Sequence, residues 1–259
     1  MRLTFLGTGT SFGVPQIGCE CEVCSSPDPR DRRARSGAIL HTGDRAILID
    51  TPPELRLQML AAGFSSVDAV LYTHEHADHV NGIDDLRIFS LRARRPIPCY
   101  GPAETLERVR AGFPYIFDDD VRPHEGTSKP RLELCPLEPG REVDIVGVPV
   151  LPLAFEHGFL RVFGYRFGPL AYITDAKAVL GSGRGALGGL DVLVLNALWW
   201  RPHPTHLSIT EAIETALALG ARRTYLTHLT HETGHADLAR RLPAGVWPAY
   251  DGLTIEVTE

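Results

Sequence analysis

The stretch Thr73-His74-Glu75-His76-Ala77-Asp78-His79 decides what kind of fold and site this sequence encodes. Four of its side chains are common metal ligands: His74, His76, Asp78 and His79. These four positions cannot share one face of a helix, because only residues three or four apart are neighbours there. We therefore predict that the stretch is a turn that follows a strand at 69–72.

Imidazole combined with carboxylate is a ligand set that suits zinc, manganese or iron. An aspartate can also bridge two ions that lie about 3.5–4 Å apart. A solvated polar turn is the alternative interpretation, but three histidines and an aspartate at this spacing favour a metal site.

Further short apolar, β-branched runs predict strands, and each ends close to a polar side chain. The runs are 46–49, 69–72, 150–155, 170–173, 192–195 and 224–226. The polar residues that follow them are, in order, Asp50, His74, His157, Asp175, Asn196 and His228. Because rigid strand ends can aim side chains into one cleft, we expect these residues to converge on one site.

One helix is predicted clearly, and one long loop is predicted beside it. Ser208 and Glu211 form a capping box, an apolar stripe follows, and Gly220 ends the helix. His206 precedes the cap, near the positive end of the helix dipole, where an anionic substrate is favoured. The polar, proline-rich stretch 118–140 predicts a surface loop.

Length and composition predict one domain over residues 1–259. With 44% hydrophobic residues, the chain can bury a core without disulfides. This composition excludes a disordered or membrane-spanning protein, and a net charge of -6 argues against coating nucleic acid. The apolar start is too short for a signal peptide, so we expect a cytoplasmic protein and no membrane partner.

The motif Cys19-Glu20-Cys21-Glu22-Val23-Cys24 places three thiols within six residues. In a reducing compartment such a cluster holds zinc more often than a disulfide, and a disulfide across so short a loop is strained. Tetrahedral zinc needs a fourth ligand, for which we predict His231, three residues after His228. We define this predicted four-ligand site on the loop at about 18–36 as the zinc clip.

The histidine motif resembles the signature of the metallo-β-lactamase-fold hydrolases. The resemblance implies an α/β fold, a four-layer αβ/βα sandwich, with a dinuclear metal centre at its edge. It implies two ligand sets, bridged by Asp175: His74, His76 and His157 on one metal, and Asp78, His79 and His228 on the other. It also implies that Asp50 supports a ligand imidazole from behind.

The start of the chain narrows this resemblance. The segments 7–15 and 18–24 look like the phosphoribosyl cyclic phosphate phosphodiesterases of the C–P lyase pathway, which share a structural zinc built from three cysteines and a histidine. The similarity implies that His206 protonates the leaving oxygen or stabilises the transition state. His203 is the alternative candidate for the acid. The related enzymes usually carry a carboxylate where this chain has Asn196.

The sequence therefore predicts a metal-dependent phosphodiesterase that acts on a small phosphate ester, cyclic esters included, with His206 and Asp78 as catalytic residues. We expect two divalent ions at the active site, zinc or manganese with iron or nickel as alternatives, and one structural zinc. The alternatives are an RNase Z-like RNA-processing nuclease, a thioester or lactone hydrolase, and a non-hydrolytic protein resembling PQQ biosynthesis protein B. We expect no nucleic-acid partner, and a homodimer is left open.

Overall fold

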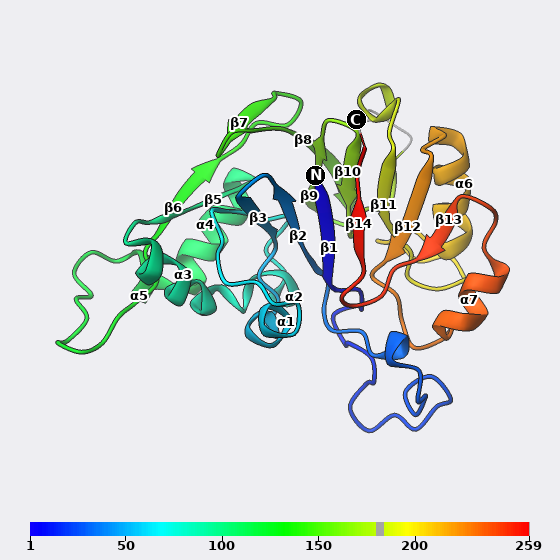
Figure 1. The fold of residues 1–259 in the computed structure, drawn as a ribbon, viewed down its shortest axis with the longest axis horizontal. Helices are drawn as coiled ribbons and strands as arrows, with labels where there is room; N and C mark the ends of the chain where they lie inside the picture. The colour runs from blue at the N-terminus through cyan, green and yellow to red at the C-terminus, as the bar shows by residue number, and fades with distance from the viewer. Residues whose placement is uncertain (180–183, 259) are drawn as a thin grey trace.

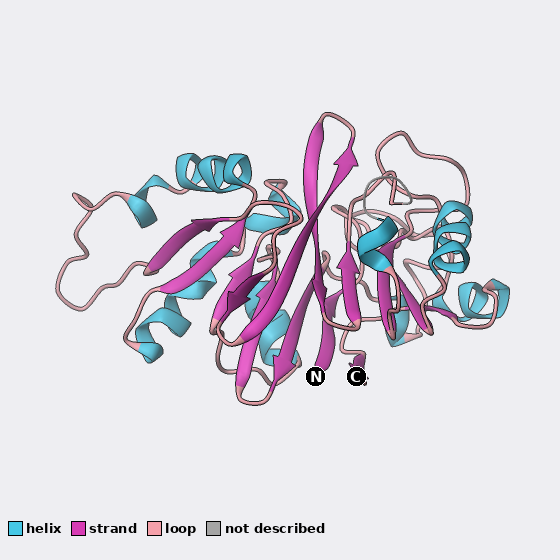
Figure 2. Cartoon of the chain, turned by 90° about the horizontal axis from the view of Figure 1, so that it is seen from above, coloured by secondary structure: helices cyan, strands magenta, loops and turns pink. Residues whose placement is uncertain are grey.

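The computed structural model describes residues 1–179 and 184–258. Over these residues the chain forms two sheets of seven strands each, with helices on the outer face of both (Figures 1 and 2). This is the αβ/βα sandwich that the sequence resemblance predicts, and the fold prediction is confirmed.

The first sheet has the strand order β14-β1-β2-β3-β4-β5-β6. Its strands are β1 (Arg2–Gly7), β2 (Gly37–Thr42), β3 (Arg45–Ile49), β4 (Ala69–Leu71), β5 (Ile97–Gly101), β6 (Leu132–Pro136) and β14 (Thr254–Glu256). From β3 to β6 the neighbouring strands are parallel, so their carboxyl ends meet at one edge of the sheet.

The second sheet has the order β13-β12-β11-β10-β9-β8-β7. Its strands are β7 (Val143–Ile145), β8 (Val148–His157), β9 (Leu160–Phe167), β10 (Leu170–Ile173), β11 (Val192–Asn196), β12 (Arg223–Thr227) and β13 (Val246–Pro248). Strands β10 to β13 are parallel, which again brings their carboxyl ends to one edge.

Helices cover the outer faces of the two sheets, as Figure 1 shows. The helices are α1 (Leu55–Ala61), α2 (Ala77–Val80), α3 (Leu86–Ala93), α4 (Ala103–Gly112), α5 (Pro114–Phe117), α6 (Ile209–Leu219) and α7 (His235–Arg241). Short 3-10 turns lie at Pro29–Asp31, Ile83–Asp85 and Arg184–Leu187. Within the described ranges, no helix is both long enough and apolar enough to traverse a lipid bilayer.

The central strands of the sandwich, such as β3 and β11, are buried on both faces, which explains their continuous apolar sequences. In β3, Ile47 and Ile49 point into the core between the sheets, while Ala46 and Leu48 point to the layer under the outer helices. A strand with period 2 can serve two cores in this way. The result is a rigid edge from which the strand ends project.

The predicted α6 helix is confirmed in detail. The Ser208 side chain accepts a hydrogen bond from the Glu211 backbone N–H at 3.2 Å, and the Glu211 carboxylate accepts from the Ser208 N–H at 2.7 Å. Gly220 ends the helix in the left-handed region at φ 65°. A glycine there has no Cβ to clash, which is why it stops the helix at little cost.

The prediction that 118–140 is a loop throughout was wrong at its end. Strand β6 lies within that stretch and pairs in parallel with β5, for example Ile97 with Leu132. The strand is an edge strand, where Pro136 removes no hydrogen bond that the sheet needs. The surrounding prolines masked a short run in which Leu132 and Leu134 alternate with polar or small residues.

Candidate metal centre

The histidine motif lies directly beyond β4, as the sequence predicts. Residues 73–76 have no regular structure, and the short helix α2 then begins at Ala77. His74 and His76 therefore project from the extended segment, whereas Asp78 and His79 project from the helix. This change of backbone lets four close neighbours in sequence point to one place.

The first candidate ligand group contains His74, His76 and His157. Their donor nitrogens lie within 4.8 Å of one another, and His74 Nε2 is 2.9 Å from His76 Nδ1. His157 is the last residue of β8, and its Nδ1 lies 2.9 Å from the Thr205 carbonyl oxygen. Donation to that carbonyl would leave Nε2 free as a metal ligand.

The second candidate group is built around Asp175, which follows β10. The Asp175 Oδ2 atom is 3.4 Å from His79 Nε2, and its Oδ1 is 3.3 Å from His228 Nε2. Asp78 Oδ2 is 3.3 Å from the same His79 nitrogen. Asp175 also lies within 4.8 Å of the ligand nitrogens of His74 and His157 in the first group, so its carboxylate reaches both groups, as a bridging ligand would.

Several of the ligand imidazoles are also held by their other nitrogen. His79 Nδ1 is 2.7 Å from Asp50, and Asp50 accepts two further hydrogen bonds at 2.8 Å from the Thr73 backbone N–H and hydroxyl. His228 Nδ1 is 3.2 Å from the Ser36 hydroxyl. Such partners fix the orientation of a ligand ring, and Ser36 is one that sequence reasoning missed.

Three site residues adopt the left-handed backbone conformation that residues other than glycine seldom use. They are Asp50, Asp175 and His228, with φ between 58° and 62°. Asp50 and His228 directly follow a buried strand, and Asp175 follows one after a single intervening residue. Asp and His tolerate this region better than most residues, and such geometry concentrates at functional sites.

The protonation states of three candidate ligands are those that a divalent cation requires. Burial lowers the pKa of His74 well below its usual value, and it lowers that of His228 to about 4. Burial alone would raise the pKa of Asp175, but His228 and His79 outweigh it and hold that pKa well below its usual value. Neutral imidazoles and an ionised carboxylate are the states in which these groups bind metal. His79 differs, because burial alone would lower its pKa but Asp175, Asp50 and Asp78 outweigh burial and hold that pKa well above its usual value, so a metal would displace a proton there.

His79 provides a further indication that these residues fit a metal. Its side chain is fully buried, and Nε2 has no hydrogen-bond partner within the described residues. This nitrogen lies between Asp78 and Asp175, so it points to the position where their oxygens converge. A buried polar atom without a partner is costly, and coordination of a cation would satisfy it.

His206 lies against the same centre from the loop before α6. Its Nε2 is 3.0 Å from Asp175 Oδ1, and its ring centroid is 4.6 Å from that of His157. Its Nδ1 is 2.9 Å from the Thr205 hydroxyl and 3.2 Å from His203 Nδ1. Of the two candidates for the acid, His206 thus reaches the centre and His203 lies behind it.

Asn196 follows a strand as the candidate ligands do, but its side chain bonds to the protein backbone. It is fully buried at the end of β11, where its Oδ1 accepts from the Ala176 N–H at 2.9 Å and its Nδ2 donates to the Ala176 carbonyl at 3.1 Å. A carboxylate could not make the second bond, because it has no donor when ionised. Asn196 therefore fixes the backbone next to Asp175.

The cysteine cluster and His231 meet as predicted, although 207 or more residues separate them. The sulfur atoms of Cys19, Cys21 and Cys24 lie 3.4, 3.3 and 3.4 Å from His231 Nδ1. Tetrahedral zinc, with bonds of about 2.3 Å to sulfur and about 2.0–2.1 Å to nitrogen, sets these separations near 3.5 Å. The backbone N–H of Cys24 lowers the pKa of Cys21 to about 6, which favours the thiolate that zinc binds.

A buried arginine joins this cluster to the metal centre, and sequence reasoning missed it. The Arg33 guanidinium is inaccessible to solvent and donates to the carbonyls of Thr230 and Thr233 and to Asp31. Asp31 in turn accepts from the His235 N–H at 2.6 Å. The loop that carries the cysteines is thereby tied to the segment 230–235, which contains His231.

Comparison with known proteins settles the family. The model for the beta-lactamase superfamily domain matches residues 45–229. The chain belongs to the beta-lactamase superfamily. A solved structure of a new diphosphatase from the PhnP family superposes with a TM-score of 0.91 at 38% identity, covering 99% of this chain and 98% of that chain.

Two curated relatives add to this comparison. The chain is 38% identical to an octanoyltransferase of Porphyromonas gingivalis across its whole length, but it spans only 52% of that protein. It is 28% identical to coenzyme PQQ synthesis protein B of Methylobacterium nodulans, over 76% of this chain and 72% of that protein. The chain thus spans about half the length of the first of these relatives.

In this member of the beta-lactamase superfamily, the candidate ligands open into a cavity of about 570 Å³. Its lining includes the metal-centre residues His76, Asp78, His157, Asp175, His206 and His228, and also Phe12, Phe159 and Trp199. A space of this size holds a small organic ligand as well as the reacting group.

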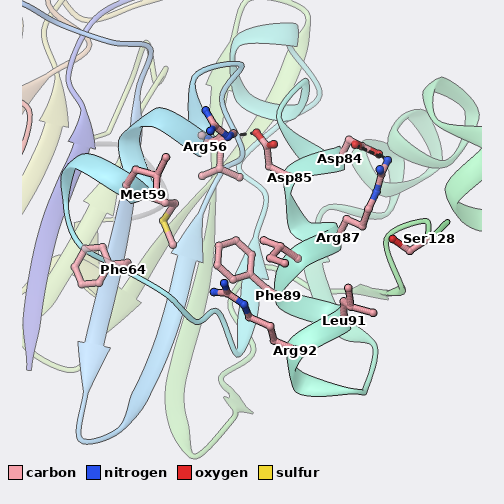
Figure 3. Close-up of a pocket in the computed structure, with 13 residues that line it drawn as sticks. Arg56, Met59, Phe64, Asp84, Asp85, Arg87, Phe89, Leu91, Arg92 and Ser128 are labelled. Atoms are coloured by element: carbon pink, nitrogen blue, oxygen red, sulfur yellow. Dashed lines mark hydrogen bonds and ion pairs between the residues drawn. The ribbon is translucent and has the colours of Figure 1, made fainter. Parts of the chain in front are cut away.

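A second cavity, of about 450 Å³, lies between α1 and α3 (Figure 3). Its wall is formed by apolar side chains such as Met59 and Phe89, with Arg56, Arg87 and Arg92 around them. None of the candidate metal ligands lines it. The candidate metal ligands therefore belong to the first cavity.

Proposed function

We propose that this superfamily member is a metal-dependent phosphodiesterase that acts on a small phosphate ester, cyclic esters included. The observation that carries the proposal is the position of Asp175. Its ligand oxygens lie within 4.8 Å of ring nitrogens of His74 and His157, which belong to one proposed ligand set. They lie 3.4 Å from His79 and 3.3 Å from His228, which belong to the other set. His206 contacts Asp175 from the cavity. Two ions, together with His206 as a histidine outside both ligand sets, are suited to hydrolysing a phosphodiester.

The proposed ligands fall into two sets that share Asp175: His74, His76 and His157, and Asp78, His79 and His228. Zinc or manganese suits these ligands, with iron or nickel as alternatives. When bound, a pair of divalent ions neutralises phosphate charge and supplies a nucleophile from water at neutral pH. Asp50 holds the His79 ring in place for this role.

Within this proposal, His206 is the general acid. It lies in the cavity at the start of α6, two residues before the helix cap, and its Nε2 faces the centre. A proton on Nε2 would be shared with Asp175 until the ester bond breaks, and would then move to the leaving oxygen. The positive end of the α6 dipole favours the anionic substrate at the same place.

The nearly full-length similarity to a diphosphatase, at 38% identity, supports a phosphorus centre over a thioester or lactone. An RNA-processing role receives less support, because none of the described residues that line the cavity is lysine or arginine. A long polyanion is normally gripped by several such cations. We also propose that Cys19, Cys21, Cys24 and His231 hold a structural zinc.

Replacing His206 by alanine should have an effect that depends on the leaving group. On a cyclic ribose phosphate, whose leaving group is an alkoxide, we expect kcat to fall by about 10²–10⁴-fold. On bis(p-nitrophenyl) phosphate the loss should be less than about tenfold, because p-nitrophenolate leaves without a proton. Product release by metal-loaded wild type and variant measures both values.

His124→Ala is the matched control, since His124 is exposed and lies outside the cavity lining. It should change neither rate. An equal loss on both phosphate substrates in His206→Ala would contradict the acid role. Turnover of a thioester, with none of either phosphate substrate, would contradict the phosphodiesterase proposal as a whole.

A further inference from the structure

Two phenylalanine rings stand exposed at the wall of the metal cavity. The Phe12 side chain is 71% exposed and Phe159 is fully exposed, and both line the cavity. Large apolar side chains in such positions add little to folding, since burial is what makes them stabilising. A ring kept exposed beside a reactive centre therefore points to a ligand that covers it.

Both rings are presented by backbone that is held in place. Phe159 is at the tip of the β8–β9 hairpin, two residues after the candidate ligand His157. The preceding Gly158 has φ +61°, and a Cβ there would come within 2.9 Å of the Thr205 side chain. The hairpin tip is thus packed closely against the segment that carries His206.

Phe12 lies in a tight turn on the loop after β1. The Gly13 N–H donates to the Thr10 carbonyl at 2.9 Å, and the Phe12 N–H lies 3.4 Å from the Thr10 hydroxyl. The same loop is anchored near the metal centre, because the Leu229 N–H donates to the Thr8 carbonyl at 2.8 Å. The ring is therefore displayed from a fixed position.

The faces of these two rings are available, unlike those of the third aromatic residue in the cavity. Arg201 stacks over Trp199 at 3.8 Å from the ring centroid, and His203 meets that ring edge-on at 5.2 Å. Neither Phe12 nor Phe159 pairs with another aromatic ring in the described part of the chain. A planar ligand can stack on a free face of this kind.

We infer that Phe12 and Phe159 form a stacking subsite for a planar base, so that the substrate is a nucleotide-like phosphate ester. This inference rests on the proposed function and names its substrate class. Stacking on aromatic side chains accepts any nucleobase, because every base has a π-face. Ser11 and Gln16 line the cavity on the same loop as Phe12 and offer polar groups to a sugar. The absence of lysine and arginine from the described cavity lining fits a single nucleotide unit rather than a strand.

The test compares two esters with the same leaving group: p-nitrophenyl thymidine 5′-phosphate and methyl p-nitrophenyl phosphate. Metal-loaded wild type should show a KM at least about tenfold lower for the thymidine ester. Phe159→Ala and Phe12→Ala should each raise that KM about tenfold, equivalent to ~1.4 kcal/mol. Neither should change the KM of the methyl ester, and Phe159→Tyr should restore the base preference.

Ile17→Ala is the matched control, because Ile17 is fully exposed on the same loop but does not line the cavity. It should leave both KM values unchanged. The Kd values of thymidine 5′-phosphate and of 2-deoxyribose 5-phosphate, measured by calorimetry, provide a readout independent of turnover. The base should tighten binding in wild type and lose its effect in Phe159→Ala.

The outcomes separate the two proposals. Equal Kd values for the two phosphates in wild type would overturn the stacking subsite while leaving hydrolysis intact. Base-dependent binding that the two alanine variants abolish, without any hydrolysis of either ester, would support the subsite and contradict the phosphodiesterase function. Base-dependent binding that both alanine variants retain would overturn the assignment to Phe12 and Phe159.

Discussion

Replacing Asp175 by alanine is expected to lower kcat/KM for bis(p-nitrophenyl) phosphate by at least about a thousandfold, because several kcal/mol of charge stabilisation depend on the metal pair. Asp175 lies close to His74 and His157 of one proposed ligand set and to His79 and His228 of the other. Without it, neither ion keeps a complete set of ligands. Metal analysis should show fewer active-site ions per chain, while circular dichroism shows an unchanged fold.

Asp191→Asn is the control for this variant. Asp191 is also a buried aspartate, but it pairs with Arg222 at 2.6 Å and Arg223 at 2.7 Å, away from the metal centre. Its replacement should lower the free energy of unfolding without changing the metal content. Full activity in Asp175→Ala would rule out the bridging role and the site built on it.

Replacing His231 by alanine should remove one zinc per chain and destabilise the fold. The zinc clip ties the amino-terminal loop to the segment that carries His228, so its loss frees both. Structural zinc contributes about 10–16 kcal/mol to small zinc-finger peptides. If only about 3 kcal/mol is lost here, Tm should fall by roughly 6–12 °C.

Cys135→Ala is the control for the zinc clip, because Cys135 is a free thiol on the edge strand β6, apart from the cluster. The zinc count should stay the same in that variant. Elemental analysis of the purified proteins measures both cases. An unchanged zinc count in His231→Ala would show that His231 is not the fourth ligand.

Much of the fold could be predicted because its central strands are buried on both faces. Runs such as 192–195 are apolar without interruption, and each ends at a polar residue that the structure places at the same edge. Strand β6 was missed since it lies at the edge of its sheet, where only part of a strand is buried. A weakly buried strand bounded by prolines carries little periodicity for a prediction to use.

The candidate site was predictable where ligands cluster in sequence or follow a strand, as His74 and Asp175 do. The residues that hold the ligands or the neighbouring backbone in place were harder to predict. Ser36 contacts His228 although 192 positions separate them in the sequence. Asn196 bonds to the backbone of Ala176, next to Asp175 with its left-handed conformation. The burial of Arg33 could not be predicted either, because two of its three partners are the backbone carbonyls of Thr230 and Thr233, which no residue type in the sequence indicates.

The most direct test of the central claim is a metal titration of phosphodiester hydrolysis. The protein is stripped of its active-site ions under conditions that retain the structural zinc, and manganese or zinc is then added back while p-nitrophenolate release from bis(p-nitrophenyl) phosphate is followed. We predict no hydrolysis by the stripped protein and a rise in activity that saturates at two added ions per chain. Hydrolysis that is independent of added metal, or no hydrolysis at any metal loading, would contradict the account.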